Sequence, residues 1–247
     1  MKSSENLFIS DIPNTTDWKP LKNHYITSHA TSSLIDLFDQ DEGGQQEQIG
    51  IWLTDNLHPR GVFHSPKIPD GKKLRELTDI LFSHEYGSIL IESKAISLTT
   101  RASLPNRSKL ARDVSSHIAK AAKQLRGGIR QLKQNTLVFN DAGIALDIER
   151  TKPMHGIILI PDLDLVENRA LYGTRFITDF MSATGSFIHI LDTSELLRIV
   201  QAAEMIAARG KTTTPMMAFD YYLVERARKS AEAETLCIEV LLRFADN

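Results

Sequence analysis

Two short apolar runs close together in the chain most limit how it can fold. Residues 78–82 and 88–92 are rich in Ile, Leu and Phe, and they flank the sequence His84-Glu85-Tyr86-Gly87. Two such runs around a spacer with Gly predict a β-hairpin. Apolar residues occupy both faces of these runs, whereas a sheet with one face in water alternates apolar and polar positions. The hairpin should therefore lie inside a sheet that is covered on both sides.

The rest of the chain adds helices and further strands. Apolar residues at spacings of three, four and seven mark one buried stripe of a long helix, which we expect to run from a cap at Ser108 to about residue 133. Further helices are expected after residue 44, from 195 to about 208 with Ser194 as cap, and from Thr214-Pro215 onward. Strands are expected at 155–160 and 187–191, and a second hairpin at 136–139 and 144–148. This mixture predicts an α/β fold.

The same pattern divides the chain into three parts: an N-terminal arm (1–44), a core (45–208) and a C-terminal helix that packs on the core (209–247). Hydrophobic residues make up 42% of the 247 residues, which is ordinary for a globular protein. A formal net charge of −2 excludes a globally basic coat, and a single cysteine, Cys237, excludes an intrachain disulfide framework. The chain shows no signal peptide, no apolar run near the roughly 20 residues that a bilayer needs, and no phosphate-binding glycine loop. We therefore expect a cytoplasmic protein with neither a membrane segment nor a nucleotide cofactor.

Three charged residues converge at one end of the first hairpin. If its turn centres on Glu85 and Tyr86, residues whose numbers sum to 171 face each other, and Asp79 lies opposite Glu92. Directly opposed side chains have Cβ atoms roughly 4.5–5.5 Å apart, so two carboxylates there repel each other. Lys94 follows Glu92 by two and points to the same side. A divalent cation such as Mg²⁺ relieves this repulsion, because it binds through one or two carboxylates together with a substrate phosphate. The pattern thus outlines a site for phosphodiester hydrolysis.

The spacing Asp79, twelve residues, then Glu92-Ser93-Lys94 resembles the PD-(D/E)xK nuclease superfamily. The resemblance covers roughly residues 45–205 and departs from the family pattern at Thr78, where Pro is usual. It implies a restriction-endonuclease-like fold, with a mixed central sheet flanked by helices, and Mg²⁺-dependent cleavage of DNA in which Mn²⁺ can substitute. It also implies that Asp79 and Glu92 hold the metal with the Ser93 carbonyl as a third ligand, that Lys94 orients or activates water, and that Gln124 on the long helix assists catalysis.

The segment that follows the hairpin is strongly basic. From Lys94 to Lys133 it contains ten basic residues and one acidic residue, Asp113. A solvated helix face normally mixes both signs of charge, so this segregation favours contact with phosphates. The residues expected to bind nucleic acid are Lys120, Lys123, Arg126 and Arg130.

Several alternatives remain open from the sequence. Glu76 and Glu47 are weaker candidates for a third carboxylate. A non-catalytic nucleic-acid-binding or assembly module that retains the nuclease fold is the alternative function, although it gives no reason to keep Asp79, Glu92 and Lys94 together. An endonuclease is favoured over an exonuclease. A role in DNA defence and a role in DNA repair both suit such a nuclease. Cutting both strands would favour a homodimer.

Overall fold

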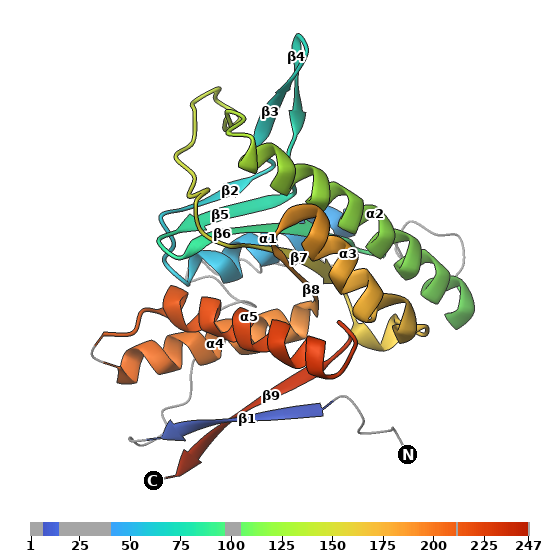
Figure 1. Cartoon of the computed structure of the whole chain (residues 1–247), viewed down its shortest axis with the longest axis vertical. Helices are drawn as coiled ribbons and strands as arrows, with labels where there is room; N and C mark the ends of the chain where they lie inside the picture. The colour runs from blue at the N-terminus through green and yellow to red at the C-terminus, as the bar shows by residue number, and fades with distance from the viewer. Residues whose placement is uncertain (1–6, 15–40, 97–104, 211, 247) are drawn as a thin grey trace.

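The computed structural model describes residues 7–14, 41–96, 105–210 and 212–246, with the backbone alone for 7–14 and 239–246. Its centre is a five-stranded mixed sheet in the order β2-β5-β6-β7-β8 (Figure 1). Strand β5 is antiparallel to both β2 and β6, whereas β6, β7 and β8 are parallel to one another. The strands are β2 (Gly61–His64), β5 (Ile80–His84), β6 (Gly87–Ser93), β7 (Met154–Ile160) and β8 (Phe187–Asp192).

Helices cover both faces of this sheet, and each face has its own apolar core. Helices α2 and α3 lie on one face, and α1, α4 and α5 lie on the other (Figure 1). The helices are α1 (Glu42–Asp55), α2 (Arg107–Lys133), α3 (Thr174–Thr184), α4 (Thr193–Arg209) and α5 (Pro215–Glu232), with short 3-10 turns at Leu163–Leu165 and Arg169–Tyr172. The predicted α/β class, a mixed central sheet flanked by helices, is confirmed.

Two further strand pairs stand apart from the central sheet. Strands β3 (Lys67–Asp70) and β4 (Lys73–Glu76) form an antiparallel hairpin between β2 and β5. Strands β1 (Leu7–Asn14) and β9 (Glu239–Asp246) pair in parallel, although they come from opposite ends of the chain.

The register of the first hairpin is the one that the sequence predicts. Ile80 pairs with Ile91, Leu81 with Leu90, and Phe82 with Ile89. Alternate residues of each strand enter the two cores: Ile80 and Phe82 join one core and Leu81 joins the other. The hairpin is therefore buried on both faces, as its sequence indicates.

Helix α2 packs very closely on this hairpin, and Gly128 allows the approach. A Cβ atom at position 128 would lie 3.0 Å from Leu90 Cδ2 and 3.2 Å from the Leu77 carbonyl oxygen. This contact holds α2 over the β5–β6 hairpin, and Asp79 and Glu92 lie at one end of that hairpin.

Several local predictions need correction. The cap of α2 is Asn106, whose side chain accepts from Lys109 N–H, and the cap of α4 is Asp192, which accepts from Glu195 N–H, so Ser108 and Ser194 lie inside the first turns. Thr214 caps α5 as predicted. Asn, Asp, Ser and Thr all cap helices, so residue type alone does not choose between neighbouring candidates.

The second hairpin is reduced to isolated bridges, because Phe139 pairs with both Lys67 and Ala145 and no continuous ladder forms around it. The helix predicted after residue 44 begins earlier, since α1 starts at Glu42. Most of the predicted arm, residues 1–6 and 15–40, lies outside the described residues. Helix α5 packs against α4, and β9 and α3 are elements that the sequence did not predict.

Candidate active site

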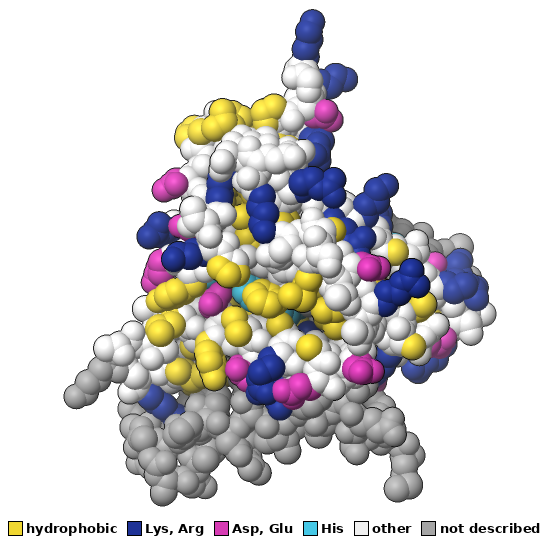
Figure 2. All heavy atoms as spheres, in the orientation of Figure 1, with side chains coloured by type: hydrophobic (Ala, Val, Ile, Leu, Met, Phe, Trp, Pro, Cys, Tyr) yellow, Lys and Arg dark blue, Asp and Glu magenta, His cyan; other side chains and the backbone are white. Residues whose placement is uncertain are grey.

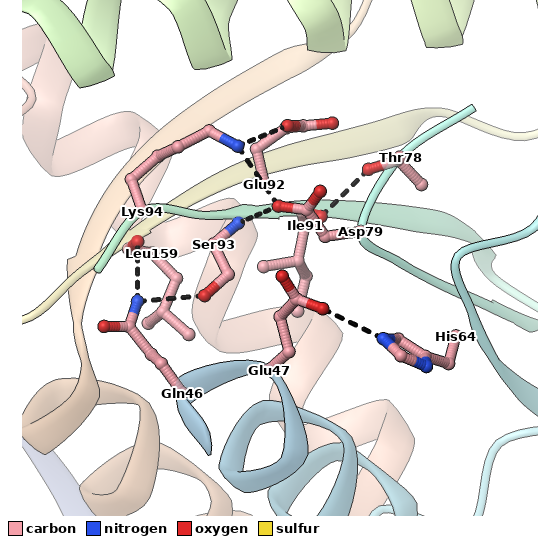
Figure 3. A network of polar contacts seen from close by, with 10 residues as sticks. All are labelled: Gln46, Glu47, His64, Thr78, Asp79, Ile91, Glu92, Ser93, Lys94 and Leu159. Carbon is pink, nitrogen blue, oxygen red and sulfur yellow. Dashed lines mark hydrogen bonds and ion pairs between the residues drawn. The ribbon is translucent and has the colours of Figure 1, made fainter. Parts of the chain in front are cut away.

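Asp79, Glu92 and Lys94 meet at one end of the β5–β6 hairpin (Figure 3). Asp79 directly precedes β5, Glu92 is near the end of β6, and Lys94 directly follows that strand. The Lys94 Nζ atom lies 2.8 Å from Glu92 Oε2 and 3.2 Å from Asp79 Oδ2. Asp79 Oδ2 also accepts from the Ser93 main-chain N–H at 2.7 Å. The two carboxylates thus face the same ammonium group, as the register predicts.

Burial and charge perturb this cluster strongly. Glu92 is fully buried and Asp79 is 8% exposed. Burial, followed by the charge of Asp79, raises the pKa of Glu92 to about 7. Burial opposes protonation of Lys94, but the charges of Glu92 and Asp79 outweigh it and raise the pKa of the ammonium. Two carboxylates and one ammonium leave a net negative charge when all three are ionised, which favours a further cation.

One oxygen of the cluster is left open. Glu92 Oε1 is buried and has no hydrogen-bond partner among the described residues, whereas Oε2 is bonded to Lys94. A buried polar atom without a partner is uncommon, because its desolvation is not compensated. Its position beside a second carboxylate makes Oε1 a candidate ligand atom for a cation or a polar substrate.

Side chains that the sequence analysis did not single out brace the cluster. Gln46 on α1 donates from Nε2 to Ser93 Oγ at 3.0 Å and to the Leu159 carbonyl at 3.1 Å. Lys94 N–H donates to the same carbonyl at 2.8 Å. Thr78 Oγ1 donates to the Ile91 carbonyl at 2.9 Å. These bonds join α1, β6 and β7 and hold the main chain at Ser93 and Lys94 in place.

The two weaker acidic candidates lie beside this cluster. Burial, and then a hydrogen bond with Asp79, raise the pKa of Glu76, and the charge of Glu47 contributes to the same rise. Glu47 Oε2 lies 2.9 Å from His64 Nε2 (Figure 3). Glu76 is thus a direct neighbour of Asp79, while Glu47 is already engaged by a histidine.

The residues of α2 that were predicted to bind DNA or assist catalysis differ in their exposure to solvent. Gln124 is exposed and makes none of the polar contacts described for the cluster in Figure 3, so its catalytic role stays a prediction. Lys120, Lys123 and Arg130 are exposed, and Figure 2 shows Lys and Arg side chains along much of the visible course of α2. Arg126 is half-buried, because its guanidinium lies 5.6 Å and 6.0 Å from the ring centroids of Phe180 and Phe176 on α3. Arg126 is therefore engaged by α3 and is less available to phosphate than the other three.

The residues present fit a hard divalent cation that is shared with a substrate. Among the described residues, no three His, Cys, Asp or Glu side chains are arranged to hold a metal ion by themselves. Mg²⁺ does not require such a cage, since it keeps several waters and binds through one or two carboxylates plus phosphate oxygens. Asp79, Glu92 and the open Oε1 atom are donors of the right kind, and the Ser93 carbonyl adjoins them in the chain.

Comparison with known proteins adds little. No protein-family model matches the chain, and no curated protein matches it. Among solved structures, the small subunit of the heterodimeric restriction endonuclease R.BspD6I is similar, with a TM-score of 0.42 and 14% identity over 76% of this chain and 83% of that chain. Similarity at this level carries no argument about activity. The described helices include none long and apolar enough to cross a bilayer.

Proposed function

We propose that this protein is a metal-dependent nuclease that hydrolyses DNA phosphodiester bonds, acting as an endonuclease. The observation that carries the proposal is the convergence of Asp79, Glu92 and Lys94, with the buried Glu92 Oε1 left without a partner among the described residues. An unpaired carboxylate oxygen beside a second carboxylate is available to bind a cation, which supports a catalytic role for the cluster.

Each residue has a distinct role in this proposal. Asp79 and Glu92, with the Ser93 carbonyl, would hold Mg²⁺ or Mn²⁺, which when bound stabilises negative charge on the attacked phosphate and eases deprotonation of water. Lys94 Nζ, held near both carboxylates, orients the attacking water and stabilises charge on the phosphate oxygens. Gln46 and the Ser93 main chain keep these groups in position, because positioning errors are costly in rate.

Exposed cations of α2 supply the attraction for the DNA backbone in this proposal. Each cation that neutralises a phosphate adds roughly 0.9 to the slope of log K against log salt concentration. Lys123→Gln combined with Arg130→Gln should therefore flatten that slope by roughly two units in a titration with Ca²⁺ in place of Mg²⁺. An unchanged slope would show that this face of α2 is merely solvated.

Nicking of supercoiled plasmid is the decisive assay, because a closed circle offers no end to an exonuclease. The wild-type protein should nick the plasmid with Mg²⁺ or Mn²⁺ and not with a chelator.

Asp79→Asn and Glu92→Gln should reduce cleavage by at least about 100-fold, since each removes a charged group at the attacked phosphate. Lys94→Ala should lower the single-turnover rate far more than the affinity, because it acts mainly in the transition state. Lys152→Gln, an exposed change near the start of β7, is the matched control.

The alternative is a non-catalytic nucleic-acid-binding or assembly module. It predicts DNA binding without cleavage under every metal tested, and equal affinity for the wild type and Glu92→Gln. Cleavage that survives both Asp79→Asn and Glu92→Gln would overturn the proposed site. A role in DNA defence or repair and a homodimeric state are compatible with the proposal, and sedimentation with and without DNA tests the dimer.

A further inference from the structure

A narrow two-stranded arm, residues 67–76, projects from the body beside the candidate active site. Figure 1 shows β3 and β4 extending beyond the other elements, and Figure 2 shows Lys and Arg side chains along the projection. All residues from Pro69 to Glu76 are exposed, so the outer part of the arm has solvent on both faces. The sequence analysis did not identify this element.

The base of the arm is fixed rather than hinged. Lys67 and Phe139 exchange two main-chain hydrogen bonds, each 2.8 Å long. Leu77 N–H donates to the Pro66 carbonyl at 2.8 Å, and Ile68 is fully buried in the core beneath α2. A fixed base means that little conformational entropy is lost when the arm contacts a partner.

The same base connects the arm directly to the proposed catalytic residues. Ser65 N–H, just before β3, donates to the Asp79 carbonyl at 2.7 Å. Glu76, the last residue of β4, is only three residues before Asp79 in the chain. A substrate that reaches Asp79 therefore passes beside the arm.

The tip is shaped as a tight turn and carries cations. Asp70 pairs with Lys73 across a two-residue connection, and Gly71 has φ +59°, which suits the first central position of a hairpin turn. Lys72 and Lys73 make no ion pair within the described part of the chain, whereas Arg75 lies 3.9 Å from Asp70 and donates to the Glu76 carbonyl at 3.3 Å. Leu74 between them is 54% exposed.

An isolated two-stranded ribbon is marginally stable in water and gains nothing from an exposed Leu beside exposed cations. These features fit an extended anionic partner that also offers apolar contacts. The grooves of duplex DNA provide both, since phosphates line their edges and thymine methyl groups lie on the floor of the major groove.

We propose that the arm enters the major groove of duplex DNA while the substrate backbone lies at Asp79, Glu92 and Lys94. This inference rests on the proposed function and names its substrate as B-form duplex. The major groove is about 12 Å wide and about 8.5 Å deep and admits a two-stranded ribbon. Beyond the buried Ile68, two residues of β3 at roughly 3.4 Å each place the turn about 7 Å from the base, and the Lys72 and Lys73 side chains extend that reach toward the groove floor. The major groove of A-form RNA is too narrow for side chains to read, so the arm selects DNA duplexes over RNA duplexes.

The test compares two charge-matched variants of the full chain in the presence of Ca²⁺. Lys72→Gln/Lys73→Gln should raise the Kd for duplex DNA at least about tenfold at 0.15 M salt, because counterion release makes each phosphate contact strongly salt-dependent. The control Lys152→Gln/Arg175→Gln, which also removes two exposed cations, should change the Kd less than about threefold. Leu74→Gln should weaken duplex binding without changing the salt slope, since it removes an apolar contact and no charge. Thermal melts of all three variants should match the wild type.

A modified duplex identifies the groove. Duplexes whose cytosines carry a bulky 5-glucosyl-hydroxymethyl group, which fills the major groove, should bind the wild type about as weakly as the arm variant binds ordinary DNA. Equal binding of modified and ordinary duplexes would mean that the arm contacts only the DNA phosphate backbone, and would overturn the assignment to the major groove. Arm and control variants that bind duplex DNA equally would overturn the inference and leave the proposed nuclease standing. Arm-dependent binding without any cleavage would support the arm and overturn the nuclease.

Discussion

Glu195 and Glu92 are both carboxylates buried against a cationic side chain, yet they differ in how many of their oxygens accept hydrogen bonds. Both oxygens of Glu195 accept from Arg226, and Tyr222 OH donates to Oε1 at 2.6 Å. Arg226 Nη2 also donates to main-chain carbonyls, at 2.7 Å to that of Ile190 and at 3.2 Å to that of Ile238. The guanidinium thus joins α4, α5, β8 and the segment before β9, and of its nitrogens only Nη1 lacks a partner among the described residues.

The hydrogen bonding of the Glu92 carboxylate is less complete. Its two acids share one ammonium, and Glu92 Oε1 is left open. The Glu195 cluster balances one acid with one base and links several elements, whereas the Glu92 cluster retains excess negative charge at one end of the β5–β6 hairpin. The Glu195 cluster is therefore structural, and the unpaired oxygen of Glu92 supports the ligand-binding role proposed above for the second cluster. Removing the cation should therefore destabilise the first cluster, whereas removing one acid from the second should leave stability unchanged or raise it.

The largest effect is expected at Arg226. Arg226→Met leaves the Glu195 carboxylate buried without its cation, which typically costs about 3–5 kcal/mol of unfolding free energy. Replacing both partners, Arg226→Met with Glu195→Met, should recover part of that loss, because no uncompensated charge remains. Recovery should be incomplete, since the carbonyls of Ile190 and Ile238 still lose a donor. Urea denaturation measures both variants, and a loss below about 1 kcal/mol for Arg226→Met would contradict the structural role.

The next effect is a pH dependence that Glu92 should impose on stability. Its pKa is raised from 4.5 to about 7 in the folded protein, so between these values the folded state retains a proton that the unfolded state has lost. The stability from this proton is fully present below about pH 4.5 and is lost as the pH rises through 7. At about 1.4 kcal/mol per pKa unit the loss is on the order of 3 kcal/mol.

Glu92→Gln removes this dependence and should be more stable than the wild type at pH 8 without metal. The difference between the two stability curves isolates Glu92, because other titrating groups contribute to both. His84 and His155 are such groups: burial lowers their pKa values to about 4 and about 3, so their contribution is lost as the pH falls. Parallel curves for the wild type and Glu92→Gln would remove the case for a perturbed carboxyl at this position.

The sequence predicts the core of the fold and the central residues of the site for one reason. The β5–β6 hairpin is local, so its apolar runs and short turn determine the register that opposes Asp79 and Glu92. The alternation of side chains along a strand is enough to predict that Lys94 lies on the same side as Glu92. These inferences require no knowledge of how distant segments pack.

The features that the sequence did not reveal depend on distant packing or lack a pattern. Gln46 reaches Ser93 only because α1 packs across β6 and β7, and a buried Gln in a polar run has no periodic signal. Arg126 is covered by α3, which the sequence analysis did not predict. The β3–β4 arm is short, charged and contains Pro69, so it reads as a loop. His84 was predicted as a turn residue, but it ends β5 and is buried, because strand β5 continues further than its apolar run.

The smallest effect sharpens the comparison within the Glu92 cluster. Asp79→Asn keeps an oxygen that can accept from Ser93 N–H but removes the charge that helps to raise the pKa of Glu92. The pKa of Glu92 should then fall, and stability at pH 7 without metal should change by less than about 1 kcal/mol, because relief of repulsion offsets the weaker contact with Lys94. Lys94→Met is the matched opposite, since loss of the ammonium should raise the pKa of Glu92 further. Carboxyl-carbon NMR titration of Glu92 measures both shifts. No shift of the Glu92 pKa in either variant would mean that burial alone controls Glu92, and that the three side chains do not act as one electrostatic unit.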